Sequence, residues 1–198
     1  MGGRVVDPMH VYRSDEHNEK VARQWRDLPD DALARHVADG STTALGMLYE
    51  RYGATLYRLT QRLLNSPADA EDVLHDVFLG LHRAIRTFNG QGTLERWLHK
   101  VAMRTALMRL RYQRNQRRLC TVLERESLHA MDGRSLADRI SFNDALGTLP
   151  PTARAVISLK LEGYSHAEIG ETLEISPSAA KQQFYRATQR LRQILEGR

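Results

Sequence analysis

Apolar residues recur at three- and four-residue steps along most of this chain, a spacing that predicts amphipathic helices rather than strands. The clearest series run from Leu45 to Leu63 and from Val73 to Ile85. A third series runs from Trp97 to Leu110, and further apolar positions begin at Leu146. We therefore predict an all-α fold.

Polar and turn-forming residues interrupt these stripes where helices are expected to begin. The sequence Leu28-Pro29-Asp30-Asp31 predicts a helix start at which aspartate side chains accept hydrogen bonds from the first free amides. The first short stripe stops at Gly40. Other candidate N-caps are Ser41 or Thr42, Ser66 before Pro67, Thr93, Ser165, and Ser176 before Pro177.

The strength of the periodicity divides the chain into two small helical domains joined by a flexible linker. Residues 1–27 are polar and weakly periodic, so we expect a flexible N-terminal extension with a short helix at 20–26. The first domain is expected at 28–118 and the second, smaller one at 142–198. Residues 119–141 show little sustained periodicity and are interpreted as the linker.

Composition adds a positive charge to this outline. The 198 residues carry a net charge of +5, and the isoelectric point is about 9.6. This balance permits binding to nucleic acid without requiring it. Cys120 is the only cysteine, which excludes an intrachain disulfide and a thiolate zinc site within one chain. We expect no metal and no cofactor.

The apolar runs are too short to cross a bilayer, and the N-terminus lacks the apolar centre of a signal peptide. We therefore expect a cytoplasmic protein without membrane insertion.

The helix expected after Pro67 carries an acidic face. Asp69, Asp72 and Asp76 are three and four residues apart, so they lie together, away from the apolar stripe. The positive helix N-terminus explains part of this placement. A solvated face and a partner surface both fit the pattern. Catalysis by paired carboxylates is not supported, because no histidine, lysine or glycine-rich phosphate loop accompanies them at a telling spacing. We expect that the chain is not an enzyme.

A glycine-bearing loop and a basic helix follow the acidic one. Residues Phe88 to Gly92 break the periodicity, and six arginines without any acidic residue lie between Arg104 and Arg118. Such a run is usually a solvated face, and the negative end of a helix accounts for one or two cations. Six arginines with Tyr112 among them favour a surface that follows phosphates.

Residues Tyr164 to Ala187 match the spacing of a helix-turn-helix. Ser165 and Glu168 predict a capping box at the start of its first helix, and Ile175 is expected to fill the turn. The small or apolar residues expected where the two helices cross are Ala167, Ile169, Gly170 and Leu173.

The second helix of this motif has an apolar and a polar side. The residues expected to point inward are Ala180, Phe184, Ala187 and Leu191, and those expected to point outward are Ser178, Lys181, Gln182, Gln183, Tyr185 and Arg186. Amides and cations of this kind can pair with base edges or phosphates in a major groove. DNA binding is the favoured interpretation, and a plain αα-hairpin is the alternative.

Both motifs, in this order and at this separation, resemble the extracytoplasmic-function (ECF) sigma factors of bacteria. The resemblance rests on Asp69-Ala-Glu-Asp-Val-Leu-His-Asp-Val-Phe and on the helix-turn-helix, and covers residues 28–118 and 142–195. It implies the region 2 and region 4 domains of that family. The implied function is binding to core RNA polymerase and promoter-specific transcription initiation through −35 and −10 contacts. The implied partners are core RNA polymerase, promoter DNA and an anti-sigma factor.

The resemblance also implies roles for individual residues. Docking on the clamp helices of the largest polymerase subunit would involve Asp69, Glu71, Asp72, Asp76 and Phe78. Recognition and melting of the −10 element would involve Phe88, Asn89, Gln91, Trp97, Lys100, Arg104, Arg109 and Arg111. Contact with the −35 element, beside the flap region of the polymerase, would involve Ser178, Lys181, Gln182, Gln183 and Arg186.

Several positions depart from the family's pattern. Arg104 stands where asparagine is frequent, Met108 where aspartate is frequent, and His82 where tryptophan is frequent. Gln183 occupies a frequent arginine position, and Glu174 replaces a frequent glycine in the turn, which favours a different bend there. The promoter sequence therefore does not follow from the family.

Two other functions compete with this interpretation. A helix-turn-helix repressor or activator would use its N-terminal domain to dimerise and would bind a palindromic duplex alone. The acidic face and the arginine-rich helix argue against it. A polymerase-binding antagonist is the second alternative, and the intact helix-turn-helix argues against that one.

Overall fold

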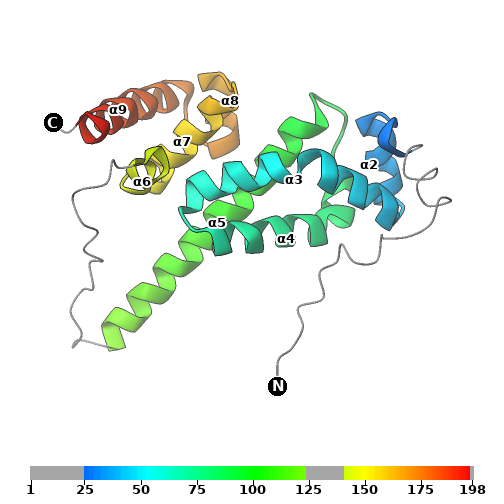
Figure 1. The fold of residues 1–198 in the computed structure, drawn as a ribbon, viewed down its shortest axis with the longest axis horizontal. Helices are drawn as coiled ribbons and strands as arrows, with labels where there is room; N and C mark the ends of the chain where they lie inside the picture. The colour runs from blue at the N-terminus through cyan, green and yellow to red at the C-terminus, as the bar shows by residue number, and fades with distance from the viewer. Residues whose placement is uncertain (1–24, 124–140, 197–198) are drawn as a thin grey trace.

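The computed structural model describes residues 25–123 and 141–196, and these two ranges contain helices and loops but no strand (Figure 1). The elements of the first range are α2 (Asp30–Ala38), α3 (Thr42–Leu64), α4 (Pro67–Ala84), the 3-10 helix η2 (Ile85–Thr87) and α5 (Leu94–Leu123). Those of the second are α6 (Phe142–Gly147), α7 (Pro151–Leu161), α8 (His166–Leu173) and α9 (Pro177–Leu195). The all-α prediction is confirmed. Residues 1–24 of the N-terminal extension, with most of its expected helix, lie outside the described residues.

Serine and threonine side chains begin most of these helices, as predicted. Ser41 accepts a hydrogen bond from the amide of Ala44 at 3.2 Å, and Thr93 accepts one from Arg96 at 3.3 Å. Ser66 and Ser176 cap α4 and α9 in the same way, each followed by proline. Ser165 forms the predicted capping box at the start of α8. These local contacts fix where α3, α4, α5, α8 and α9 start.

The prediction for the start of α2 is wrong in one respect. Pro29 occupies the N-cap position, and no side chain caps this helix. The carboxylate of Asp30 instead accepts hydrogen bonds from Arg51 and Tyr52 of α3. A charged guanidinium is a stronger partner for a carboxylate than a neutral amide, so the tertiary contact prevails over the local one. It attaches α2 to α3.

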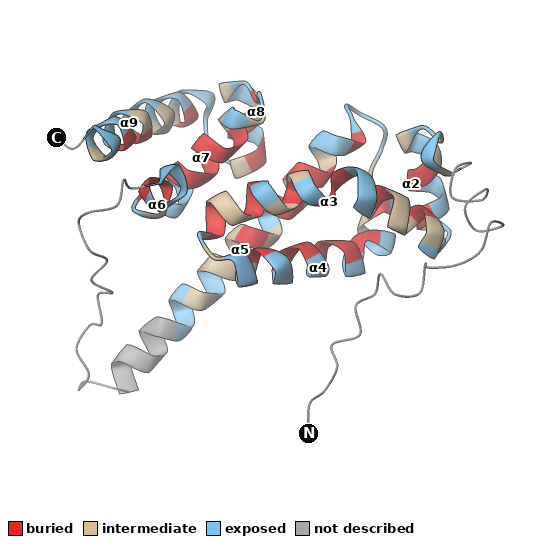
Figure 2. Cartoon of the chain, viewed as in Figure 1, coloured by how far each residue is buried: buried red, intermediate tan, exposed pale blue. Residues whose placement is uncertain are grey.

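The predicted apolar stripes form the core of the first range, shown in red in Figure 2. All six positions of the stripe predicted from Val73 to Ile85, which spans α4 and the start of η2, are buried: Val73, Leu74, Val77, Phe78, Leu81 and Ile85. They pack against the leucines of α3 and against Leu98, Ala102 and Met103 of α5. The opposite side of α4 is exposed, which positions its acidic residues at the surface.

The helices of the second range pack directly on those of the first. Ala155, Val156 and Leu159 of α7 belong to the same buried cluster as the core of α3, α4 and α5. A smaller cluster, centred on Leu146 and Leu191, joins α6, α7 and α9. The two sets of helices therefore share apolar surface.

The expected linker, residues 119–141, differs from the structure at its start. Helix α5 continues to Leu123, and residues 124–140 lie outside the described ranges. No glycine or proline stands between Arg118 and Leu123, so the sequence contains no signal to end the helix at the expected place.

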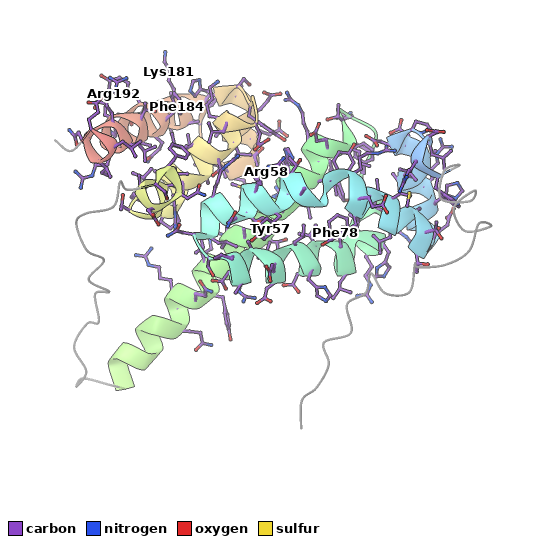
Figure 3. The ribbon with its side chains drawn as sticks, viewed as in Figure 1. Tyr57, Arg58, Phe78, Lys181, Phe184 and Arg192 are labelled. Carbon is purple, nitrogen blue, oxygen red and sulfur yellow. The ribbon has the colours of Figure 1, made fainter. Side chains whose placement is uncertain are left out.

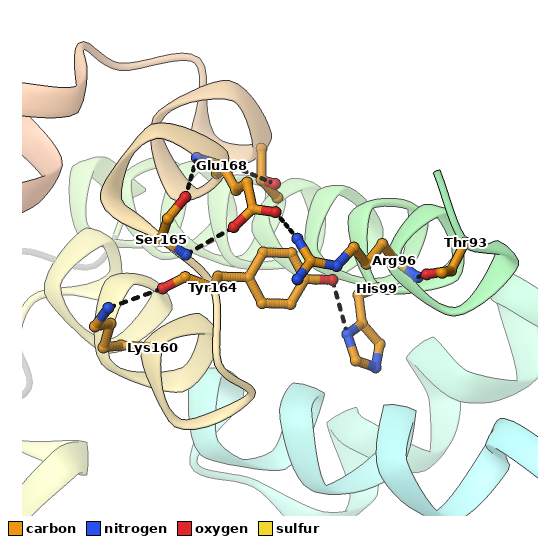
Figure 4. A network of polar contacts seen from close by, with 8 residues as sticks. Thr93, Arg96, His99, Lys160, Tyr164, Ser165 and Glu168 are labelled. Carbon is orange, nitrogen blue, oxygen red and sulfur yellow. Dashed lines mark hydrogen bonds and ion pairs between the residues drawn. The ribbon is translucent and has the colours of Figure 1, made fainter. Parts of the chain in front are cut away.

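A buried hydrogen bond lies where the two sets of helices meet. His99 of α5 is 3% exposed, and its Nδ1 atom lies 2.9 Å from the hydroxyl oxygen of Tyr164, which precedes α8 (Figure 4). Burial lowers the pKa of His99; the nearby carboxylates of Glu95 and Glu162 oppose this shift, and Arg96 adds to it. Burial likewise raises the pKa of Tyr164 to about 12. Both rings are thus neutral at pH 7.

We expect acid to weaken the fold through His99. Because its pKa is lower in the folded chain, the unfolded chain takes up the proton first, so the stability contribution is complete above about pH 6.5 and declines below it. The loss approaches about 1.4 kcal/mol per pH unit in the window between the two pKa values. Urea unfolding of wild type and His99→Gln at pH 7.5 and 5.5 measures it. Parallel pH dependence in the two proteins would contradict the assignment.

The turn between α8 and α9 keeps its left-handed bend despite the loss of glycine. Glu174 adopts φ of 59° at the end of α8, so the expectation of a different bend is wrong. Ile169 and Gly170 are buried at the helix crossing, as expected, whereas Ala167 is exposed and takes no part in it. Gly170 lies so close to the turn that an added Cβ would be 2.7 Å from the carbonyl oxygen of Ile175.

Replacing Gly170 with alanine is expected to destabilise the protein by about 1–3 kcal/mol, because the new methyl group would push against backbone atoms. Gly80→Ala in α4 is the matched control, since a Cβ there meets nothing within 4 Å. The control should instead stabilise by about 0.5–1 kcal/mol, as alanine favours the helix. Urea unfolding distinguishes the two. Equal effects would show that the close approach at Gly170 carries no cost.

Candidate functional site

Three surfaces carry the residues singled out by the sequence, and the first is the outer face of α4. Glu71, Asp72 and Asp76 are exposed there, on the side opposite the buried stripe. Leu79, three residues after Asp76, is 60% exposed on the same side. One exposed leucine is ordinary on a protein surface, and here it adds apolar area beside three carboxylates. Its position outside the buried stripe was the signal for it in the sequence.

The acidic face is tied to α5 by one arginine. Arg109 donates to Asp72 Oδ2 at 2.5 Å from Nη2 and to Asp69 Oδ1 at 3.2 Å from Nε. The side-chain amide of Gln113 adds a bond of 2.8 Å to Asp69. Partial burial alone would raise the pKa of Asp69, but hydrogen bonds from Gln113, Ser66 and Arg109 outweigh it and lower that pKa. Arg109 therefore contacts the acidic face rather than lying free for nucleic acid.

Phe78, assigned by resemblance to the polymerase-binding set, does not lie on this surface. Its side chain is only 6% exposed, and its ring packs edge-on against Tyr49 with centroids 4.9 Å apart. The reason is its position in the apolar stripe, next to Val77. Phe78, labelled in Figure 3, therefore helps to hold α4 against α3.

The second surface is the loop before α5 with the start of that helix. Gly90 and Gly92 adopt φ of 74° and 80°, and the side chain of Asn89 accepts a hydrogen bond from the amide of Gln91 at 3.1 Å. Phe88 and Trp97 lie at the base of the loop, with ring centroids 5.8 Å apart. The loop thus holds exposed amide side chains above a pair of partly buried aromatic rings.

The predicted cations of α5 do not share one environment. Lys100 and Arg104 pair with Glu171 and Glu174, at the end of α8, whereas Arg111 is exposed near the far end of the helix. Met108 and Tyr112 are both more than 60% exposed beside these cations. The side chains of Arg117 and Arg118 lie outside the described part of the chain.

The third surface is the outer face of α9. Its exposed polar residues are Ser178, Lys181, Gln182, Tyr185 and Arg186, and Gln183 is half-buried. Ala180, Ala187 and Leu191 are buried beneath them, and Phe184 packs on His166. Lys181 points away from the packed helices (Figure 3). The predicted division of α9 into an inner and an outer side is confirmed.

Comparison with known proteins connects these surfaces. The family model for sigma-70 region 2 matches residues 48–116, and that for sigma-70 region 4 matches residues 139–191. The ECF RNA polymerase sigma factor SigM of Mycobacterium tuberculosis is 31% identical over 168 residues, which cover 83% of each chain. The chain belongs to the ECF sigma factor family. It is a transcription initiation factor that works with core RNA polymerase at promoter DNA.

Further relatives agree with this assignment. The sigma factor CarQ of Myxococcus xanthus is 31% identical over 163 residues, which cover 79% of this chain and 92% of CarQ. Two solved structures share the fold of this sigma factor. One is CnrH in complex with the cytosolic domain of CnrY (24% identity, TM-score 0.59, covering 85% of this chain and 97% of that one). The other is the sigma factor RpoE in complex with the anti-sigma factor NepR from Bartonella quintana (20% identity, TM-score 0.62, covering 76% of this chain and 96% of that one). None of the described helices of this sigma factor could cross a membrane.

Proposed function

We propose that this sigma factor contacts the polymerase and the two promoter elements through the three surfaces described above. The observation that carries the proposal is that the acidic residues of α4 and the basic and amide residues of α9 are exposed on separate helices, with the loop at 88–92 on a third surface. Residues 28–118 would form the region 2 unit and residues 142–198 the region 4 unit, with the linker between them. The chain would work in the cytoplasm, where its partners are, and would leave the chemistry to the polymerase.

The outer face of α4 is the proposed dock for core polymerase. Asp72, Asp76 and Glu71 supply negative charge, and Leu79 supplies apolar area for the centre of the contact. Carboxylates around an apolar residue fit a basic, helical partner such as the clamp helices, because charge orients the encounter and burial of Leu79 stabilises it. Phe78 would act indirectly, by holding α4 in place.

The loop at 88–92 and α5 form the proposed −10 surface. Extracting a base costs a few kcal/mol of stacking, which an aromatic pair and nearby cations can offset. Phe88 and Trp97 would stack against the extracted base, and Asn89 and Gln91 would hydrogen-bond to it. Lys100, Arg104 and Arg111 would follow the backbone phosphates. Arg109 would join them only after leaving Asp69 and Asp72.

The outer face of α9 is the proposed −35 surface. Lys181 and Arg186 are five residues apart and both exposed, so they can flank the amide of Gln182 in a major groove. Ser178 and Gln183 would add contacts at the start and side of the helix. The flap region of the polymerase would hold this domain over the duplex.

An anti-sigma factor is the further partner proposed for this chain. The support is that CnrH and RpoE, which share its fold, were solved with CnrY and NepR bound.

Run-off transcription with purified core RNA polymerase tests the proposal. Addition of this chain should produce transcripts that start at discrete sites and require both promoter elements. A failure to initiate selectively on any template, across a genomic fragment library, would refute it. The rival, a dimeric helix-turn-helix regulator, would instead bind palindromic duplex without polymerase, which a gel-shift experiment with the chain alone detects.

A further inference from the structure

The acidic side of α8 faces the cations that the proposed function assigns to the −10 element. Three pairs join α5 to α8: Arg96 with Glu168, Lys100 Nζ with Glu171 Oε1 at 2.7 Å, and Arg104 Nη2 with Glu174 Oε1 at 3.1 Å. Both series advance along the chain in the same direction. Figure 4 shows the first of these pairs, with Glu168 also bonded to the start of its own helix.

The spacing of the three pairs is regular. The cations recur every four residues along α5, and the carboxylates recur every three residues along α8. At about 1.5 Å of rise per residue, these steps correspond to about 6 Å and 4.5 Å. The difference is small enough for side chains of ordinary length to form all three pairs. The acidic side of α8, with Glu174 just after it, therefore presents a carboxylate to each of three successive cations of α5.

Apolar and buried polar contacts hold α8 in this place. Tyr164 is buried against His99, and the guanidinium of Arg96 lies 4.9 Å from the centroid of its ring. Arg62 of α3 forms a further pair with Glu162, at 2.6 Å and with both side chains less than a quarter exposed. The three exposed ion pairs alone would be too weak to hold two domains together.

We propose that α8 is an internal competitor of promoter DNA. Its carboxylates pair with Lys100 and Arg104 when α8 lies on α5, an arrangement we call the closed chain. The −10 strand and α8 therefore cannot bind these cations at the same time. This inference rests on the proposed −10 role of α5.

The carboxylates of α8 cover cations of the −10 surface but leave the −35 surface uncovered. Lys181, Gln182 and Arg186 on the outer face of α9 remain exposed while α8 lies on α5. The closed chain therefore offers its −35 surface and withholds part of its −10 surface. Contact with the −10 strand requires α8 to leave α5.

Neutralising the exposed carboxylates tests the proposal. Glu171 and Glu174 are 73% and 76% exposed, so Glu171→Gln with Glu174→Gln should leave the fold intact. Binding of a fluorescent mixed-sequence single-stranded oligonucleotide to the free chain, measured by anisotropy, should become about tenfold tighter, because individually weak pairs bias rather than lock the equilibrium. The control Asp39→Asn with Glu196→Gln makes the same change in charge away from α5 and should have little effect.

A second measurement follows closure without DNA. Dyes at Arg58→Cys on α3 and Gln189→Cys on α9, in a Cys120→Ser background, report the distance between the two sets of helices. FRET efficiency should fall in the Gln variant and further with Glu171→Lys and Glu174→Lys. Adding Lys100→Glu and Arg104→Glu to the lysine variant restores opposite charges, so it should restore FRET but not oligonucleotide binding.

The outcomes separate this inference from the proposed function. Unchanged FRET together with unchanged oligonucleotide binding, in both the neutral and the reversed variants, would overturn the proposal that the carboxylates of α8 compete with DNA. A fall in FRET without tighter oligonucleotide binding would overturn the masking, because these cations would then have no role with DNA. Selective run-off transcription by the wild type, measured separately, reports on the proposed function whichever result is obtained.

Discussion

Reversing the charge of Asp72 and Asp76 to lysine is expected to weaken binding to core RNA polymerase by about 100-fold. Both carboxylates are exposed on α4 beside Leu79, and a basic partner surface would then meet like charge, which costs several kcal/mol at an interface. Asp72→Lys also removes a partner of Arg109. Pull-down or biolayer interferometry with immobilised core enzyme measures the change.

Two controls separate docking from folding in that experiment. Asp39→Lys, at the end of α2, makes the same change in charge as either single substitution and should leave affinity for the polymerase unaltered. Asp76→Lys alone lies outside the Asp72–Arg109 pair and should still weaken binding by about tenfold. Wild-type affinity in the double variant would place the polymerase dock elsewhere on the chain.

Removing two cations from α9 is expected to have the second large effect. Lys181→Ala with Arg186→Ala should lower transcription from promoters that depend on a −35 element by about 100-fold, since each base or phosphate contact contributes about 1–3 kcal/mol. Both side chains are exposed, so the fold should be unaffected. Run-off transcription with reconstituted holoenzyme measures the loss.

Arg192→Ala is the matched control for this experiment. It removes one cation from the same helix, beyond the proposed surface, where the arginine pairs with Glu196. Transcription should fall less than twofold. If it fell as far as in the double variant, overall positive charge rather than the proposed surface would explain DNA binding.

Contacts between near neighbours in the chain could be predicted from the sequence. Ser66 and Ser165 cap helices through atoms three residues away, so residue type and spacing were sufficient. The buried stripe of α4 could be predicted equally well, because helical geometry alone places Val73 and Leu81 on one side. The exposed side of α9 followed by the same reasoning.

Contacts between distant residues could not be predicted. Arg109 was assigned to DNA because it lies in an arginine-rich helix, yet it bonds Asp72, 37 residues earlier. Asp30 was expected to cap its own helix, yet it bonds Arg51 across 21 residues. Nothing in a local pattern distinguishes a cation free for a phosphate from one already paired, because that depends on which helices pack together.

The ion pair between Arg109 and Asp72 joins the proposed polymerase-binding surface on α4 to the proposed DNA-binding surface on α5. In the proposed function, a polymerase surface that binds Asp72 would leave Arg109 held by Asp69 alone, and a phosphate that binds Arg109 would release the carboxylate of Asp72. Thermodynamic reciprocity then requires that each ligand change the affinity for the other by the same factor. This one ion pair would therefore couple the two proposed surfaces, so that promoter and polymerase would favour each other's binding.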